Sequence, residues 1–145
     1  MNKELSYAAR RLWAKKGRKG NAQWLPLITH MEDSAAMARY IWRSWLGQGA
    51  KQNIAQCCGC DEETAEMLFV FIMAVHDIGK ATPLFQEKSP LGYVGERIRE
   101  ELINAGLIAE SHKGFSLSHL SPHALAGQIY LESMGCKRSI AAIIG

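Results

Sequence analysis

An apolar run from Met67 to Val75 constrains the fold of this chain more than any other feature. No polar residue interrupts the run, and a helix that is apolar on every side belongs in the interior of a protein. The run is followed at once by the segment 76–80, which reads His-Asp-Ile-Gly-Lys. An imidazole and a carboxylate at the end of a buried helix are unfavourable unless something compensates both. The sequence therefore predicts a central buried helix that ends in a polar site.

Two interpretations of His76-Asp77 are open at this point. A metal ion would compensate both side chains, because it can bind an imidazole nitrogen and a carboxylate oxygen together. Alternatively, the pair is only a helix cap or an ion pair, since short motifs of this kind also occur by chance. Gly79 is expected to let the chain turn after the helix, which would allow Lys80 to approach an anionic ligand.

Length and composition restrict the class of protein. The chain has 145 residues, 48% of them hydrophobic and 21% charged, which is typical of one soluble globular domain. No apolar run is long enough to span a bilayer, and the first residues contain no apolar signal segment. We therefore expect a cytoplasmic protein with reduced thiols and no membrane partner. Cys57 and Cys60 form a C-x-x-C, but neither a βαβ pattern nor a second ligand pair accompanies it.

The net charge of +3 is distributed unevenly along the chain. Between positions 3 and 19, Glu4 is the only acidic side chain. The basic residues of this segment are Lys3, Arg10, Arg11, Lys15, Lys16, Arg18 and Lys19. Such a cluster can bind the phosphates of a nucleic acid. The alternative is a solvated terminal segment without a partner.

Helical patterns account for most of the chain, and no segment alternates apolar and polar residues over the length of a strand. Helices are expected over about 29–46, over 62–76 with Asp61 as N-cap, over about 93–110, from 122 to a stop at Gly135, and from 139 onwards. Residues 23–27 are expected to be extended, because Pro26 disfavours helix at the preceding residue. The buried side of the first helix is expected to be Ala35, Ala36, Met37, Ala38, Ile41, Trp42 and Trp45. The predicted fold class is all-α.

The histidines form a pattern within this arrangement. His30, His76 and His123 each lie near the end of an expected helix. Helix ends can bring ligands from several helices to one point inside a bundle. One ion would then be held by His30, His76 and Asp77, and a bridging Asp77 with His123 would begin a second site. Two metal ions about 4 Å apart can activate a water molecule and stabilise the leaving oxygen of a phosphoester.

These residues and their surroundings resemble the HD superfamily of metal-dependent phosphohydrolases. More narrowly, four segments resemble the N-terminal HD nuclease domain of the CRISPR type I helicase–nuclease. The segments are Leu12-Trp13-Ala14-Lys15, the stretch 24–35 around His30, the stretch 76–80, and His123-Ala124-Leu125-Ala126-Gly127. The resemblance extends from about Leu12 to the last residue. It implies that residues 1–145 form an HD-domain helical bundle with a metal site at converging helix ends.

The resemblance also implies a function. This is metal-dependent endonuclease or exonuclease cleavage of single-stranded DNA in CRISPR antiviral defence. The implied partners are single-stranded DNA, a helicase domain on the same or a separate chain, and the CRISPR RNA-guided surveillance complex. The resemblance assigns His30, His76 and Asp77 to a first divalent metal ion, and Asp77 with His123 to a second. It assigns Lys80 to the scissile phosphate. Iron, manganese, cobalt, nickel and zinc are all compatible with histidine and carboxylate ligands.

Three further residues are possible members of the site. His119 is the alternative to His123, which we prefer because it opens a helix and precedes the Ala-Gly of the family pattern. His112 matches no position of the family and is expected to be exposed to solvent. Asp33 is expected to support a ligand or the start of a helix rather than to bind metal.

The sequence departs from the family near its last residues. In the family an adjacent His-His pair and a later metal-binding Asp follow the region where this chain ends, at Ile143-Ile144-Gly145. We therefore expect the N-terminal portion of an HD nuclease domain, without the helicase and with some ligands missing. Two alternatives remain at this point. One is an HD phosphohydrolase acting on nucleotides or cyclic dinucleotides, and the other is a catalytically incomplete fragment that only contacts a partner.

Overall fold

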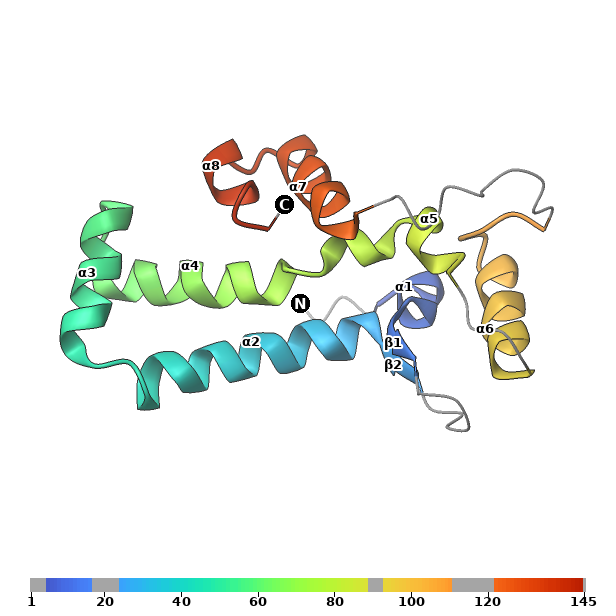
Figure 1. Ribbon diagram of the computed structural model, residues 1–145, viewed down its shortest axis with the longest axis horizontal. Coiled ribbons are helices and arrows are strands. Elements are labelled where there is room, and N and C mark those ends of the chain that lie inside the picture. Colours follow the sequence, from blue (N-terminus) through green and yellow to red (C-terminus); the bar gives the residue numbers. More distant parts are fainter. Residues whose placement is uncertain (1–4, 17–23, 89–92, 111–121, 145) are drawn as a thin grey trace.

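A computed structural model describes residues 5–16, 24–88, 93–110 and 122–144 of the chain. Most of these residues are helical, which confirms the predicted all-α class (Figure 1). In chain order the elements are α1 (Tyr7–Arg11), β1 (Trp13–Lys16), β2 (Trp24–Pro26), α2 (Leu27–Ser44), α3 (Gln48–Cys58), α4 (Glu62–Val75), the 3₁₀-helix η1 (Ile78–Ala81), α5 (Pro83–Gln86), α6 (Tyr93–Asn104), α7 (His123–Ser133) and α8 (Arg138–Ala141). Among the described helices, none is long and apolar enough to cross a membrane.

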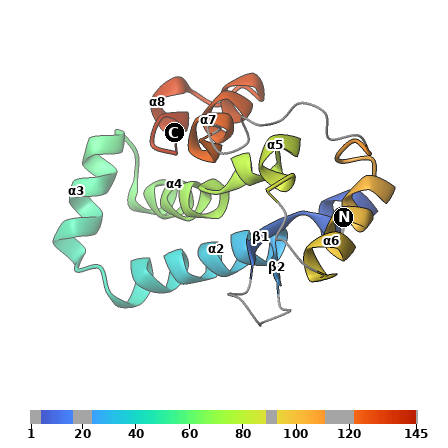
Figure 2. The ribbon, with the colours of Figure 1, turned by 45° about the vertical axis from the view of Figure 1, so that its right-hand side comes forward.

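Two long helices, α2 and α4, lie side by side and run in opposite directions, with α3 connecting them at one end (Figures 1 and 2). Buried Trp42, Ala55 and Ala65 bring the three helices together in one core, and the Trp42 ring lies 5.5 Å from that of Phe69. α3 was not among the helices expected from the sequence, since two glycines, Gly47 and Gly49, follow the helix expected over 29–46. Gly47 is instead the residue that precedes the first turn of α3.

The start of α4 follows the prediction. Asp61 is the N-cap, and its side chain accepts a hydrogen bond from the backbone N–H of Thr64 at 2.7 Å. Glu62 and Glu63 occupy the first turn, where negative charge stabilises the helix dipole. The preceding helix ends at Gly59, whose φ of 65° requires a conformation that glycine adopts without strain. Local signals therefore determine where the apolar helix begins.

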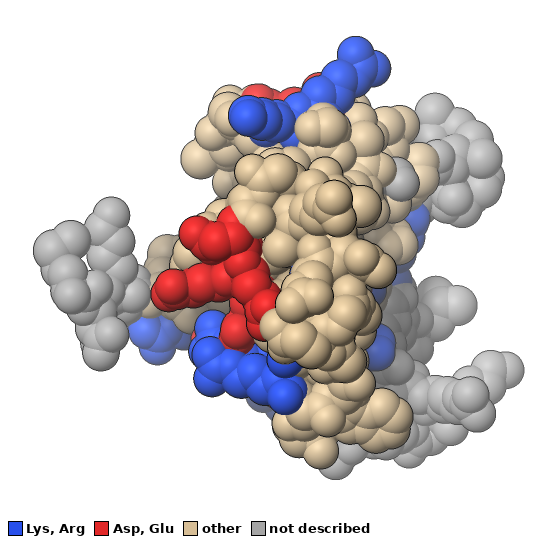
Figure 3. Space-filling view, turned by 90° about the vertical axis from the view of Figure 1, so that its left-hand side faces the viewer, with Lys and Arg blue, Asp and Glu red and all other residues tan. Residues whose placement is uncertain are grey.

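The burial of the helices differs from the prediction. Met67 and Phe71 in α4 are 60% and 41% exposed, so the apolar run is not covered on every side by the described residues. Met37 and Trp45 were predicted on the buried side of α2, but they are 57% and 77% exposed. Figure 3 shows the end of the molecule near α3. Acidic side chains lie directly beside basic ones there, and residues without a charged side chain form most of the surface around them.

The described residues also contain a two-stranded antiparallel sheet, which the sequence pattern did not predict. β1 pairs with β2 in the register Trp13↔Pro26, Lys15↔Leu25 and Lys16↔Trp24, with an irregularity between Trp13 and Lys15. The extended backbone predicted over residues 23–27 is confirmed for Trp24–Pro26, whereas Leu27 already begins α2, two residues before the predicted helix start, and residue 23 lies outside the described residues. Strands of three and four residues are too short to show an alternating pattern. The Trp13 side chain continues from β1 into a second core with Ile98 and Leu102 of α6.

The C-terminal helices pack on the end of α4. Leu131, Ala141 and Ile144 form a third core, against which Ile72 and Val75 of α4 and Ile78 of η1 are packed. α7 begins at His123 with Pro122 at its N-cap position, one residue later than predicted, and Ser121 lies outside the described residues. The predicted stop at Gly135 is confirmed by its φ of 89°. α6 ends at Asn104 rather than near Glu110, and Gly106 follows with a φ of 70°.

Candidate metal centre

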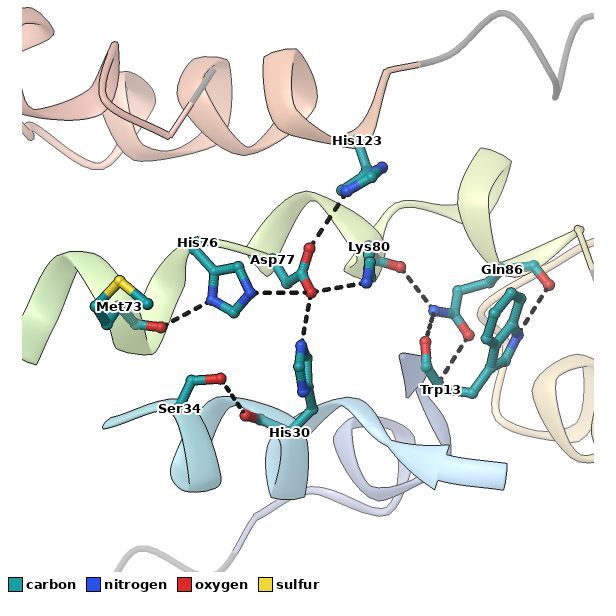
Figure 4. Close-up of polar contacts among 9 residues, drawn as sticks. All are labelled: Trp13, His30, Ser34, Met73, His76, Asp77, Lys80, Gln86 and His123. Carbon is teal, nitrogen blue, oxygen red and sulfur yellow. Dashed lines mark hydrogen bonds and ion pairs between the residues drawn. The ribbon is translucent and has the colours of Figure 1, made fainter. Parts of the chain in front are cut away.

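Asp77 is the centre of a polar cluster where α2, α4, η1 and α7 meet (Figure 4). Its side chain is buried, with 6% of the residue exposed. Oδ2 lies 2.7 Å from His30 Nε2, 2.7 Å from Lys80 Nζ and 3.2 Å from His76 Nε2. Oδ1 lies 3.3 Å from His123 Nε2. One carboxylate is thus surrounded by three imidazoles and an ammonium group.

Two backbone carbonyls help to fix the histidine-bearing turns. The His76 Nδ1–H donates a hydrogen bond to the Met73 carbonyl at 2.8 Å, and because a carbonyl only accepts, Nδ1 carries the proton. When the imidazole is neutral, its Nε2 lone pair then faces Asp77. His30 lies in the first turn of α2, where its own carbonyl accepts a hydrogen bond from Ser34 Oγ at 2.8 Å. Carbonyl contacts of the His76 type commonly orient metal-binding histidines.

The electrostatics of the cluster favour an ionised Asp77. Burial is the largest single influence, and it opposes ionisation of the carboxyl. Hydrogen bonds from Lys80 and His30, together with the charges of Lys80 and His76, outweigh burial and lower the pKa of Asp77 below its usual value. The carboxylate is therefore charged at neutral pH and can bind a cation.

Two glycines allow η1 to approach α7 closely. A Cβ atom at Gly79 would lie 1.8 Å from the His123 carbonyl oxygen and 2.5 Å from the Gly127 nitrogen. Gly79 does not have a positive φ, so its role is close packing rather than the turn that the sequence suggested. Gly127 faces Gly79 from α7, and a Cβ atom at Gly127 would lie 3.2 Å from the Gly79 nitrogen. This close approach places the first residue of α7, His123, within reach of Asp77.

The donor atoms present fit a bound metal ion. One ligand atom from each of His30, His76 and Asp77 lies within 4.8 Å of the others, and these are two imidazole nitrogens and a carboxylate oxygen. Such sets suit divalent transition metals. His30 Nε2–H donates to the carboxylate in the structure, and a metal ion would take the place of that proton. His123 and Asp77 Oδ1 would supply the two ligands available for a second ion.

The structure thus brings together all five predicted site residues, although their roles as ligands stay predictions. His112 and His119 lie outside the described residues. Asp33 is exposed and lines a groove of about 270 Å³ between α2 and α4, not the metal centre. The sequence did not point to Gln86, whose side chain donates hydrogen bonds to the carbonyls of Trp13 and Lys80. A glutamine beside Leu84 and Phe85 carries no sequence signal of burial.

Comparison with known proteins indicates the family of the chain. The family model described as Cas3, HD domain, matches residues 13–145. The chain is 37% identical over 142 residues to the CRISPR-associated nuclease/helicase Cas3 of Streptococcus thermophilus, covering 92% of this chain and 15% of that protein. It is also 37% identical over 79 residues to the CRISPR-associated endonuclease/helicase Cas3 of Thermus thermophilus, covering 54% of this chain and 8% of that protein.

The fold agrees with a solved structure as well. A crystal structure of a CRISPR-associated protein superposes with a TM-score of 0.74 at 27% identity, covering 97% of this chain and 15% of that one. The chain therefore spans about 15% of the length of the relatives that it matches over most of its own length.

Proposed function

The chain belongs to the Cas3 HD-domain family, and from this premise we propose that it acts as a metal-dependent nuclease on single-stranded DNA. The observation that carries the proposal is the set of donor atoms on His30, His76 and Asp77, which lie within 4.8 Å of one another. A lone His-Asp cap would not require a second histidine from a distant helix. The convergence of α2 and α4 on one carboxylate supports a metal-binding role instead.

A divalent metal ion bound here would supply a hydroxide at neutral pH and would polarise a phosphate oxygen. The residues of the chain prepare the site for that ion. His76 Nδ1–H donates to the Met73 carbonyl, which leaves Nε2 directed into the site. Asp77 is ionised, since its pKa is lowered, and its two oxygens face different histidines. Asp77 is therefore the residue best placed to bridge two ions.

Lys80 is the residue proposed to act on the phosphate. Its ammonium group lies 2.7 Å from Asp77 Oδ2, and its side chain is 11% exposed. A positive charge fixed beside the ligands would stabilise the negative charge that develops on the phosphate oxygens during hydrolysis. Removing it is expected to reduce the rate of cleavage more than the affinity for DNA.

The basic residues near the N-terminus are proposed to bind the DNA backbone. Among the described residues, Lys15 has an exposed side chain, whereas Arg11 forms an ion pair with Glu101 at 3.0 Å and lies over the Tyr7 ring. Arg11 is therefore engaged within the fold. Lys3, Arg18 and Lys19 lie outside the described residues.

The relatives are named as nuclease/helicases of CRISPR systems, and the proposed partners follow from that likeness. We propose a helicase domain on the same or a separate chain and a CRISPR RNA-guided surveillance complex, in antiviral defence in the cytoplasm. The proposed cofactor is one or two divalent ions of iron, manganese, cobalt, nickel or zinc.

The test is cleavage of circular single-stranded DNA by the purified chain with Mn²⁺, Co²⁺, Ni²⁺ or Zn²⁺, or with Fe²⁺ under anaerobic conditions. We expect metal-dependent cleavage that is lost in His76→Ala and in Asp77→Ala. A circular substrate reports endonuclease action, and a linear substrate also reports exonuclease action. Hydrolysis of nucleotides or cyclic dinucleotides without DNA cleavage would favour the HD phosphohydrolase alternative. Metal binding or DNA binding without any hydrolysis would favour an interaction fragment.

A further inference from the structure

Gln86, the last residue of α5, is completely buried and has a partner for each hydrogen-bonding group of its side chain. Oε1 accepts the backbone N–H of Trp13 at 3.1 Å. Nε2 donates to the Trp13 carbonyl at 2.9 Å and to the Lys80 carbonyl at 2.6 Å. In return, the Trp13 indole N–H donates to the Gln86 carbonyl at 3.3 Å. The amide therefore joins β1 to the end of η1 (Figure 4).

Lys80 is the residue that this amide reaches in the polar cluster. Its backbone N–H donates to the Asp77 carbonyl at 2.9 Å, its ammonium group donates to Asp77 Oδ2 at 2.7 Å, and its carbonyl accepts from Gln86. The backbone of Lys80 is thus held at one side by Asp77 and at the other by Gln86. The position of Nζ depends on both attachments, because the side chain is buried and has little room to compensate for a backbone shift.

We propose that Gln86 is a positioning residue of the metal centre. It fixes the Lys80 backbone against β1 and thereby directs the ammonium group toward Asp77. The inference rests on the proposed function, since the alignment of Lys80 and Asp77 matters only if these groups act on a metal ion and a phosphate. Gln86 itself does not touch the ligands, so it acts through Lys80.

The residue type follows from the contacts. Glutamate has a similar shape but cannot donate to the two carbonyls, and its buried charge would repel both. Methionine is of similar length but would leave the Lys80 carbonyl and both backbone groups of Trp13 without their present partner. Asparagine keeps the amide but is one methylene shorter, so it cannot span β1 and η1 at once. Only the glutamine amide supplies one acceptor and two donors at this distance.

A purely structural role is the rival explanation, and Trp13→Phe provides the matched control. This variant removes the indole N–H bond to the Gln86 carbonyl but leaves the amide contacts to Lys80 in place. Both Trp13→Phe and a Gln86 variant disturb the same core. Only the Gln86 variant should disturb Lys80.

The direct test is NMR of the complete chain labelled with ¹⁵N-lysine, in the presence of Zn²⁺ as a diamagnetic ion. The ammonium signal of Lys80 is assigned by its absence in Lys80→Met. We expect this signal to be protected from exchange in the wild type and in Trp13→Phe, and to be lost or shifted in Gln86→Met and in the milder Gln86→Asn. An unchanged Lys80 signal in either folded Gln86 variant would overturn the inference, whatever the activity of the protein.

A double-mutant cycle tests the consequence for the reaction. We expect Gln86→Asn to lower kcat by about tenfold with little change in KM, because a displaced Lys80 ammonium group would stabilise the transition state less well. In the Lys80→Met background the same substitution should change kcat by less than about twofold, while its effect on urea unfolding stays the same. Equal losses of kcat in both backgrounds would show that Gln86 does not act through Lys80. If the wild type cleaves no DNA, the proposed function fails, and the NMR result still decides the role of Gln86.

Discussion

Replacing Gly79 by alanine is the sharpest test of how the metal centre is assembled. The added Cβ would lie 1.8 Å from the His123 carbonyl oxygen and 2.5 Å from the Gly127 nitrogen, both of which are backbone atoms. Backbone atoms cannot rotate away as the end of a side chain can. The first turn of α7 must therefore move by about 1.6 Å, the difference between 1.8 Å and the 3.4 Å of an ordinary contact.

The displacement of α7 would affect both the stability of the protein and the position of His123. Overpacking of this kind destabilises a protein by about 1–3 kcal/mol, and reduced freedom of the unfolded chain offsets about 0.4–1 kcal/mol of it. Both clashes are with backbone atoms, so the cost lies at the upper end of this range, and we expect Gly79→Ala to lower the free energy of unfolding by about 2 kcal/mol. His123 would move with α7, and its 3.3 Å approach to Asp77 Oδ1 would be lost. The set of His30, His76 and Asp77 does not involve α7 and should keep its affinity for one ion.

Gly127→Ala is the matched control. Its Cβ would lie 3.2 Å from the Gly79 nitrogen and 3.3 Å from Ile78 Cγ2, so the neighbours need to move by only a few tenths of an ångström. Alanine in the interior of α7 also stabilises the helix by about 0.5–1 kcal/mol relative to glycine. We expect the control to stay within about 1 kcal/mol of the wild type.

The assays are urea unfolding of the metal-free protein, followed by tryptophan fluorescence, and calorimetric titration with Mn²⁺. Our interpretation of the contact between η1 and α7 is refuted if Gly79→Ala is as stable as the wild type. Loss of the first ion in a folded Gly79→Ala protein would show instead that α7 supports the ligands of α2 and α4.

Three further predictions concern charge. Asp77→Ala should weaken Mn²⁺ binding in calorimetric titration more than His123→Ala does, because the Asp77 carboxylate lies beside both proposed metal positions. Equal affinity for Mn²⁺ in Asp77→Ala and the wild type would contradict the proposed metal site. The pKa of Asp77 is lowered in the folded state, so the stability that its ionisation contributes is present above the unfolded pKa of about 4 and is lost as the pH falls through the folded pKa. Unfolding of metal-free Asp77→Asn by urea should thus depend less steeply on pH below about 4 than that of the wild type. Neutralising the four basic side chains between positions 15 and 19 should flatten the slope of log affinity for single-stranded DNA against log salt, whereas an unchanged slope would mark a solvated segment.

The position of the central helix was predictable because local chemistry determines it. Asp61 caps α4, and the apolar run leads directly to His76-Asp77. The convergence of His30 and His123 on Asp77 was suggested by helix-end positions and by the family resemblance. In each case the residues that allow the prediction lie within a few positions of the helix end or the site residue that they predict.

The rest depended on contacts between distant segments. The exposure of Met67 and Trp45 reflects which helix faces find a partner, and a hydrophobic pattern does not contain that information. The same is true of Gly79, where only the approach of α7 shows why a side chain cannot be accommodated. The sequence contains no signal for Gln86 because its partners are backbone groups of Trp13 and Lys80, which every residue type except proline would supply.

The three cores together explain how the ligands are aligned. The core around Leu131 fixes α7 on the end of α4, and so determines the position of His123 relative to Asp77. The core around Trp42 holds α2 against α4 at the end near α3, and His30 lies at the opposite end of α2, where it meets Asp77. The core around Trp13 holds the strand that Gln86 connects to Lys80. The three cores involve different elements, so each partner of Asp77 depends on a different set of contacts. Damage to one core should therefore affect one partner of Asp77 before the others.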